Sequence, residues 1–292
     1  MIAIATGNDP ADVETQLRAA SAAAKNISGG GAQGYHLMNA YIAWADEWTR
    51  MLRSRIEKAD LERLILVPEY WALRAHTPED FGQAFMSHMF DELFARESDL
   101  LAAAEEIRHE SQRWAGRGLD PIAVVLDTNI FLEWGDSLLE QDWHELLGLR
   151  PHRFLYLVLT RVVLDELDRH KQSRDASTQG QWRRAHAQAA IRSLWGMFGT
   201  HDLEMGYERT DSIPVRRAKF ELVTDTIEHV QLDDPDAEIL DRARALTAYV
   251  PTQVMTFDTG MALRGRAAGV DVVLATQPVH SPKKPKRIPP GS

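Results

Sequence analysis

Two apolar segments of this sequence are each followed by an aspartate. VVLD ends at Asp127 and VMTFD ends at Asp258. Ligands of open parallel sheets bind beyond the carboxyl ends of the strands, where both carboxylates would lie. A lone aspartate at such a position is explained by capping of the next helix. Two of them, joined by further acids at helix starts, favour an acidic binding site.

Further carboxylates occur at two predicted helix starts. In RVVLDELDRHK, Glu166 lies on or beside the apolar face of the helix, and Asp234 and Asp236 come just ahead of AEILDRA. A carboxylate against an apolar face needs a partner, because an unpaired buried charge is costly. An arginine would make Glu166 part of a structural ion pair, whereas a divalent cation would make it part of a functional site.

Acids clustered in this way repel each other, and they stay ionised together only with cations between them. Carboxylate oxygens are ligands that suit Mg²⁺ or Mn²⁺. Such a centre can clamp a phosphodiester, activate a water and stabilise the leaving oxygen. The chain has no cysteine, so a thiolate zinc site and a thiol nucleophile are excluded, and its isolated histidines show no zinc-site spacing.

The order of these acidic segments resembles the four acidic motifs of PIN-domain proteins. The resemblance covers about 121–280, and the segments are LDTNIFLE (126–133), VVLDELDRHK (162–171), DDPDAEILDRA (233–243) and TFDTGMALRGRAAGV (256–270). It implies a three-layer α/β/α fold with a mainly parallel sheet and helices on both faces. It also implies an endoribonuclease dependent on Mg²⁺ or Mn²⁺, which cleaves single-stranded or structured RNA and leaves 3′-hydroxyl and 5′-phosphate ends.

The resemblance also assigns roles to individual residues. The acids expected to be catalytic and to bind metal are Asp127, Glu166, Asp236 and Asp258. Asp234 would replace or join Asp236 if the helix began earlier. The polar residues expected to support the acids or the phosphate are Thr128, Asn129 and Thr256.

Basic residues near the acidic motifs are candidates to hold RNA phosphates. The residues expected to bind substrate are Arg161, Arg169, Lys171 and Arg264. Arg183 and Arg184 beside Trp182 are weaker candidates for phosphate contact and base stacking, because a solvated helix face is the favoured explanation for them.

The spacing of apolar residues predicts the elements that position these side chains. After residue 119, strands are expected at 122–127, 154–160, 219–225, 254–258 and 270–275. Helices are expected at 137–149, 161–172, 181–198, 235–246 and 260–269. Strands that alternate with helices are typical of an α/β domain with a mainly parallel sheet.

Three regions follow from this pattern. Residues 1–118 are expected to be mostly helical and have no assigned role, with helices at 10–26 and 33–58, a loop or short strand at 64–73, and a helix from a cap at Thr77 to about 114. Residues 119–280 form the PIN-like nuclease domain. Residues 281–292, SPKKPKRIPPGS, form a basic, proline-rich tail that is expected to be disordered.

Composition limits the cellular setting and the partners. No signal peptide and no membrane-spanning segment is recognisable, and the absence of cysteine fits a reducing compartment, so a cytoplasmic protein without a membrane partner is expected. The net charge of −10 argues mildly against a large surface that coats nucleic acid. RNA remains the expected partner, DNA is an alternative, and a homodimer or an inhibitor protein is left open.

Three other functions compete with an RNA-cleaving enzyme. A PIN-like module that lost catalysis would bind RNA or protein. A haloacid-dehalogenase-type phosphatase is disfavoured, because that chemistry needs a second aspartate where this sequence has Asn129. A DNA nuclease of the flap-endonuclease type also uses a cluster of acidic residues. Such enzymes generally need more acids and a helical element that grips DNA, which the sequence does not reveal.

Overall fold

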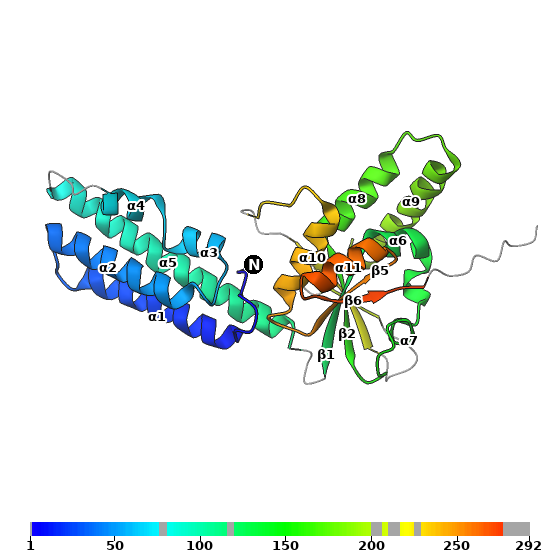
Figure 1. The fold of residues 1–292 in the computed structure, drawn as a ribbon, viewed down its shortest axis with the longest axis horizontal. Coiled ribbons are helices and arrows are strands. Elements are labelled where there is room, and N and C mark those ends of the chain that lie inside the picture. Colours follow the sequence, from blue (N-terminus) through cyan, green and yellow to red (C-terminus); the bar gives the residue numbers. More distant parts are fainter. Residues whose placement is uncertain are drawn as a thin grey trace, which may run out of the picture.

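A long helix connects the two apolar cores of this protein. The structure is a computed structural model, and it describes residues 2–75, 81–115, 120–199, 206–209, 217–224 and 229–276, with only the backbone of residue 136. One core lies among the N-terminal helices and the other surrounds a β-sheet. Figure 1 shows the helical part beside the α/β part, with the end of the long helix α5 reaching the sheet.

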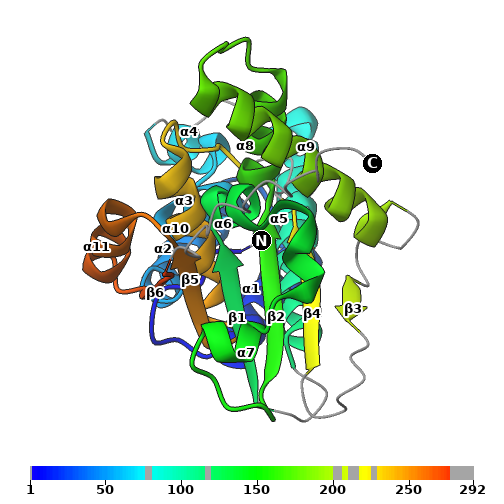
Figure 2. The same cartoon turned by 90° about the vertical axis from the view of Figure 1, so that its right-hand side faces the viewer.

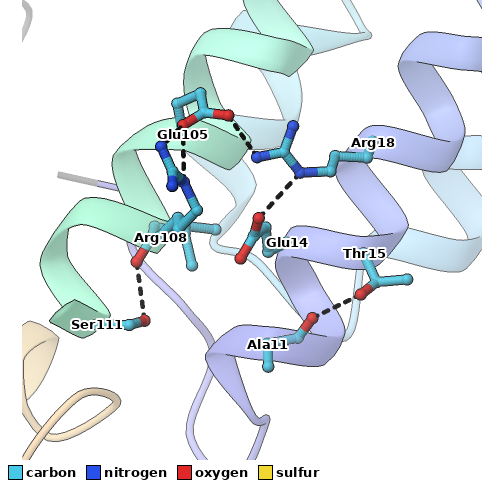
Figure 3. Close-up of polar contacts among 8 residues, drawn as sticks. Ala11, Glu14, Thr15, Arg18, Glu105, Arg108 and Ser111 are labelled. Carbon is cyan, nitrogen blue, oxygen red and sulfur yellow. Dashed lines mark hydrogen bonds and ion pairs between the residues drawn. The ribbon is translucent and has the colours of Figure 1, made fainter. Parts of the chain in front are cut away.

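The N-terminal part is helical, as predicted. Its helices are α1 (Pro10–Gly29), α2 (Gly34–Leu52), α3 (Lys58–Leu64), α4 (Pro68–Ala75) and α5 (Gln83–Arg113). Helices α1 and α5 pack along each other, and Arg18 of α1 bridges Glu14 at 2.9 Å and Glu105 of α5 at 2.5 Å (Figure 3). These exposed pairs lie at the edge of a buried interface whose apolar side chains supply most of the stabilisation.

Two expectations for this part were wrong in detail. The helix expected at 33–58 is divided, because α2 ends at Leu52 and α3 begins at Lys58. The loop or short strand expected at 64–73 is replaced from Pro68 onward by helix α4. Proline lacks the N–H that a helix interior needs, but in the first turn that N–H has no intrahelical partner in any case. The expected cap at Thr77 lies outside the described residues.

A six-stranded sheet forms the second part, and its strand order is β3-β4-β2-β1-β5-β6. The strands are β1 (Pro121–Leu126), β2 (Phe154–Thr160), β3 (Tyr207–Arg209), β4 (Arg217–Val223), β5 (Thr252–Thr256) and β6 (Asp271–Leu274). All pairings are parallel except that of the edge strand β3 with β4. The α/β class with a mainly parallel sheet is therefore confirmed.

Helices cover both faces of this sheet. Tyr156 of β2 contacts Trp114, which follows α5, whereas Phe220 of β4 contacts Trp143. The register pairs Phe220 with Leu157, so Phe220 lies on the face opposite Tyr156. The helices of this part are α6 (Thr128–Trp134), the 3₁₀ helix η2 (Gly135–Glu140), α7 (Trp143–Leu146), α8 (Arg161–Gln172), α9 (Thr178–Phe198), α10 (Pro235–Leu246) and α11 (Thr259–Ala267).

Most of the elements predicted for this part agree with the structure to within a few residues, but one predicted helix is broken, and helix α6 and strand β3 were not predicted. The continuous helix expected at 137–149 is broken into η2 and α7, because Asp142 starts a new helix by accepting a hydrogen bond from the Glu145 amide at 3.2 Å. Strand β3 was not expected at all, since it is three residues long and is defined only by its pairing with β4.

The two parts meet through the end of α5. Arg113 donates to the carboxylate of Glu221 on β4 at 2.9 Å, and the hydroxyl of Tyr156 donates to the Arg113 carbonyl at 3.1 Å. The side chain of Glu221 is fully buried, and Lys219 forms a second ion pair with it. A buried carboxylate with two cationic partners fixes where α5 joins the sheet, because breaking such a pair leaves an uncompensated charge.

Among the residues that the structure describes, no helix is long and apolar enough to cross a bilayer. The expected boundary at 118/119 falls within 116–119, and the tail at 281–292 falls within 277–292; both lie outside the described residues.

Candidate active site

Parallel strands bring the starts of several helices to one edge of the sheet. Strand β1 leads into α6, β2 into α8 and β5 into α11, and β1 lies between β2 and β5. Their carboxyl ends therefore share one edge. In Figure 2 the helices α6 and α8 stand at the end of the strands opposite α7. We call the five acids carried by these helix starts and by α10 the acid edge: Asp127, Glu166, Asp234, Asp236 and Asp258.

Asp127 is the most buried acid of this edge, with an exposed fraction of 1%. Its backbone starts α6, but its side chain makes no capping hydrogen bond. Instead, Oδ2 accepts a hydrogen bond from Thr256 Oγ1 at 2.7 Å and one from Asn129 Nδ2 at 3.2 Å. Helix capping, the alternative explanation for an aspartate here, therefore does not account for this carboxylate.

The surroundings of Asp127 disfavour its ionised form. Burial raises the pKa of the Asp127 carboxyl, and the negative charge of Glu166 raises it further. The hydrogen bonds from Thr256 and Asn129 lower the pKa but do not cancel the effect of burial. Among the described residues no lysine or arginine is paired with Asp127, so this carboxylate lacks the positive charge that a buried anion normally has.

Glu166 lies on α8 and points toward the same edge. Its Oε2 accepts a hydrogen bond from Thr128 Oγ1 at 2.6 Å. The Thr128 hydroxyl therefore contacts Glu166, whereas a backbone hydrogen bond from Thr128 lowers the pKa of Asp127. Within the described chain Glu166 forms no ion pair with an arginine, so the structural alternative considered for it is not present.

Asp236 and Asp234 lie at the start of α10. Asp234 caps this helix by accepting from the Asp236 amide at 3.2 Å, and the carboxylate of Asp236 is ion-paired with Arg264 of α11. Burial raises the pKa of Asp236, and the charge of Asp127 raises it further, whereas Arg264 opposes the shift. Asp234 and Asp258 add smaller effects in the same direction as Asp127. The acids of the edge thus interact electrostatically.

Asp258 is exposed and is used as a helix cap. Its Oδ1 accepts from the amides of Gly260 at 2.5 Å and Met261 at 3.0 Å. Strand β5 ends at Thr256, two residues before Asp258, and the fully buried Thr256 hydroxyl accepts from the Asp258 amide at 2.9 Å while it donates to Asp127. Thr256 therefore connects the two acids that follow the strands.

The donor chemistry of this edge fits Mg²⁺ or Mn²⁺. Only carboxylate, hydroxyl and amide oxygens are offered, and two of the carboxylates have raised pKa values because each is buried and, to a smaller extent, because each lies near other negative charge. A cation placed among them would favour their ionised forms and so oppose those shifts. Among the described residues no three acids or histidines already lie in the arrangement of a metal centre, so binding would need the side chains to turn toward the ion.

The structure separates the basic residues that were expected to bind substrate. Arg264 is paired with Asp236, Lys171 with Asp168 at 3.2 Å, and Arg161 with Asp165 at 3.7 Å. Arg169 is exposed and makes no ion pair or hydrogen bond within the described residues. Of the four candidates, only Arg169 is free to contact a phosphate without giving up another partner.

A buried glutamate on α10 was missed by the sequence analysis. Glu238 is 1% exposed, and it accepts hydrogen bonds from His229 at 2.7 Å and from the Leu232 amide at 2.9 Å. It is also paired with Arg242, one helical turn later, at 3.3 Å. These contacts hold the segment before α10 against the helix and so place Asp234. The spacing of four residues between Glu238 and Arg242 was the available signal.

One comparison with known proteins gives a match. The sequence model of a family described as PIN domain matches residues 124–276, a little more than half of the chain, and this range includes the whole acid edge. No curated protein matches the chain. PIN domains are generally nucleases and typically use divalent metal ions.

Proposed function

Because the chain belongs to the PIN-domain family, we propose that it is a metal-dependent endoribonuclease that hydrolyses RNA phosphodiester bonds at the acid edge. The observation that carries the proposal is the environment of Asp127, a buried carboxylate without a cationic partner in the described chain. The charge of Glu166 raises the pKa of Asp127, and the charge of Asp127 in turn raises the pKa of Asp236. Such an arrangement costs stability unless a cation joins it, which is characteristic of functional sites.

The residues that would hold Mg²⁺ or Mn²⁺ are Asp127, Glu166 and Asp236, with Asp258 and Asp234 at the rim. When bound, the ion would offset charge on the phosphate oxygens and make a water more acidic. Thr256 and Asn129 fix the orientation of the Asp127 carboxylate, and Thr128 does the same for Glu166.

Arg264 has a further part in this proposal. It neutralises Asp236 in the structure, and it lies at the surface with about half of its side chain exposed. When a cation takes over that neutralisation, the guanidinium becomes free to contact a phosphate of the substrate. This keeps Arg264 as a substrate-binding residue that is released only at the loaded site.

The test is cleavage of labelled single-stranded RNA and single-stranded DNA of equal sequence, with Mn²⁺, with Mg²⁺ and with EDTA. Asp127→Asn is compared with Asp165→Asn, a control that removes an exposed carboxylate one residue from Glu166 on the same helix. Both variants are checked by circular dichroism. We expect metal-dependent cutting of RNA by wild type and by Asp165→Asn, and loss of at least a hundredfold in Asp127→Asn. The products should carry 5′-phosphates.

Full activity in folded Asp127→Asn would sink the site assignment. Cutting of DNA in preference to RNA would change the proposed substrate from RNA to DNA, and the proposal of metal-dependent phosphodiester hydrolysis would remain. If neither polymer is cut by folded protein with either metal, the chain is a PIN-like module that binds RNA or protein without cleaving it.

A further inference from the structure

The strongest positive charge of the described chain is concentrated in one helical hairpin. The basic hairpin, as we call residues 169–199, comprises the end of α8, the connecting turn and α9. It contains six lysines and arginines and one acid, Asp175, giving a net charge of +5 in a chain whose total is −10. Both views show its turn end projecting away from the sheet, from the end where α6 lies (Figures 1 and 2), whereas the later part of α9 packs on α6 and η2.

Most of these cations have no partner in the part of the chain that the structure describes. Arg174, Arg183 and Arg192 are exposed and, like Arg169, make no hydrogen bond or ion pair within the described residues. Arg184 differs, since it donates to the Asp175 carbonyl at 3.0 Å and is partly buried. The structure thus distinguishes Arg183 from Arg184, which the sequence could not, and identifies Arg183 as the one available to a ligand.

The turn of the hairpin is held by its own hydrogen bonds. Asp175 accepts from the amide and the hydroxyl of Ser177, both at 2.9 Å, and the Ser177 hydroxyl caps α9 by accepting from the Gly180 amide at 3.0 Å. A Cβ on Gly180 would lie 2.4 Å from the Asp175 carboxyl carbon, so this close approach requires glycine. The free arginines therefore sit on a fixed scaffold, which lowers the ordering cost of binding.

The basic hairpin is continuous with the acid edge. Arg169 and His170 lie three and four residues after Glu166 on α8, hence on the same side of the helix. Burial lowers the pKa of His170, and the charge of Arg183 on α9 lowers it further, while Glu166 opposes the shift. Arg183 is therefore close to the face of α8 that leads back to Glu166.

An aromatic surface accompanies the arginines. The ring of Trp182 stacks on His186 with centroids 4.1 Å apart, and His186 Nδ1 donates to the Leu132 carbonyl at 2.7 Å. Trp182 is held in this way with 36% of its surface exposed, beside Arg183. Stacked aromatic rings next to free arginines are the combination that binds unpaired bases and the backbone between them.

We propose that the basic hairpin binds a single-stranded segment of the RNA substrate and directs it to the acid edge, with Arg169, Arg174 and Arg183 on phosphates and Trp182 against a base. This inference rests on the proposed function for its substrate, and it adds the surface that holds that substrate. Helix α9 has 21 residues and is on the order of 30 Å long, enough for a strand of several nucleotides.

The test measures binding apart from cleavage. Fluorescence anisotropy of a labelled single-stranded RNA is recorded in EDTA, with every variant built on Asp127→Asn. Arg174→Gln/Arg183→Gln is compared with Arg50→Gln/Arg53→Gln, a pair of exposed arginines around the end of α2 that gives the same change in net charge. We expect the hairpin pair to weaken binding at least tenfold, and to reduce the slope of log K against log salt by about 1.4, whereas the control pair changes neither.

Two further variants separate charge from fold. Arg174→Lys/Arg183→Lys should restore most of the salt dependence, because lysine keeps the phosphate attraction. Trp182→Ala should weaken binding at least fivefold with an unchanged salt slope, because stacking does not release counterions. Equal loss of binding in the hairpin pair and the control pair would overturn the inference, as would the absence of RNA binding by the parent protein.

Failure of the inference and failure of the proposed function give different results. If the wild-type protein cuts RNA and the hairpin pair in an intact Asp127 background cuts it equally well at low RNA concentration, the hairpin inference is wrong and the nuclease proposal stands. If the wild-type protein cuts nothing but the hairpin pair loses RNA binding selectively, the nuclease proposal is wrong and the binding surface stands.

Discussion

Replacing Asp127 by asparagine should make the metal-free protein more stable while it abolishes the stabilisation by metal. Asparagine has nearly the same shape, and its Oδ1 can accept the same hydrogen bonds from Thr256 at 2.7 Å and Asn129 at 3.2 Å. The substitution removes only the negative charge, which is 1% exposed and lies near Glu166. Most substitutions of buried residues destabilise, so a gain in stability here would be informative.

The size of the gain follows from the electrostatics of Asp127. Each pKa unit by which burial raises the folded-state pKa corresponds to about 1.4 kcal/mol of cost for the ionised form at neutral pH. We therefore expect Asp127→Asn to increase the free energy of unfolding in EDTA by on the order of 1 kcal/mol. For the α/β part of the protein, an increase of this size corresponds to a rise in melting temperature of about 2–4 °C.

The pH dependence has a definite sign. Because folding raises the pKa of Asp127, the folded protein holds this proton more tightly than the unfolded chain does. The contribution of Asp127 to stability is therefore greatest below the unfolded-state pKa of about 3.9, and it is lost as the pH rises through the higher folded-state pKa. Asp127→Asn has no carboxyl group to ionise at this position, so it does not lose stability as the pH rises. The variant should therefore become more stable than wild type as the pH rises through these two pKa values, and the difference should vanish at lower pH.

Thermal unfolding with EDTA and with increasing Mn²⁺ tests both parts. A ligand at a hundred times its dissociation constant adds about 2.7 kcal/mol to wild type, whereas Asp127→Asn should gain little. The order of stability of the two proteins then reverses between EDTA and saturating Mn²⁺. An Asp127→Asn protein that is less stable in EDTA and still gains the full stabilisation with Mn²⁺ would refute the reasoning.

Three further perturbations test the rest of the arrangement. Thr256→Val removes a fully buried hydroxyl that donates to Asp127, and it should lower the free energy of unfolding by about 1.5–3 kcal/mol in urea titrations and reduce RNA cleavage. Asp258→Asn retains a good helix cap and should keep the melting temperature nearly unchanged while cleavage falls, whereas a purely capping role predicts unchanged cleavage. Glu221→Ala leaves Arg113 without its buried partner, and it should lower the free energy of unfolding by about 3–5 kcal/mol, measured by urea titration against Asp258→Asn as a reference.

The fold was readable where local sequence decides the structure. The apolar runs of β1, β2 and β5 gave their position and their parallel class, because strands buried on both faces need continuous apolar side chains. Helix α4 was missed because Pro68 was read as a breaker, although a proline in the first turn is compatible with a helix. Strand β3 could not be read, since three residues carry no periodicity and the pairing with β4 defines them.

The site shows the same division between local and distant effects. The acids themselves could be listed, because four of them follow a strand or lie at a helix start and Glu166 lies beside the apolar face of its helix. Their partners could not: Arg113 and Glu221 are separated by 108 residues, and the ion pair of Arg264 with Asp236 depends on how α11 lies beside α10. Arg264 was accordingly expected to be free for phosphate, and the structure shows it engaged with an acid.

The position of the acids at helix starts explains how the chain tolerates them before any cation binds. Asp127 begins α6, Asp234 and Asp258 cap α10 and α11, and Asp236 lies in the first turn of α10. The N-terminus of a helix carries partial positive charge and free amides, which stabilise a nearby anion by about 0.3–1 kcal/mol. That stabilisation is enough for the exposed Asp234 and Asp258, which accept hydrogen bonds from the amides directly.

The same stabilisation is not enough for Asp127, whose carboxylate is buried and makes no capping bond. Helix capping and metal binding are therefore not competing explanations for this edge. The capping acids hold the helix starts in place, whereas the uncapped carboxylate of Asp127 is stabilised only by a cation or by protonation.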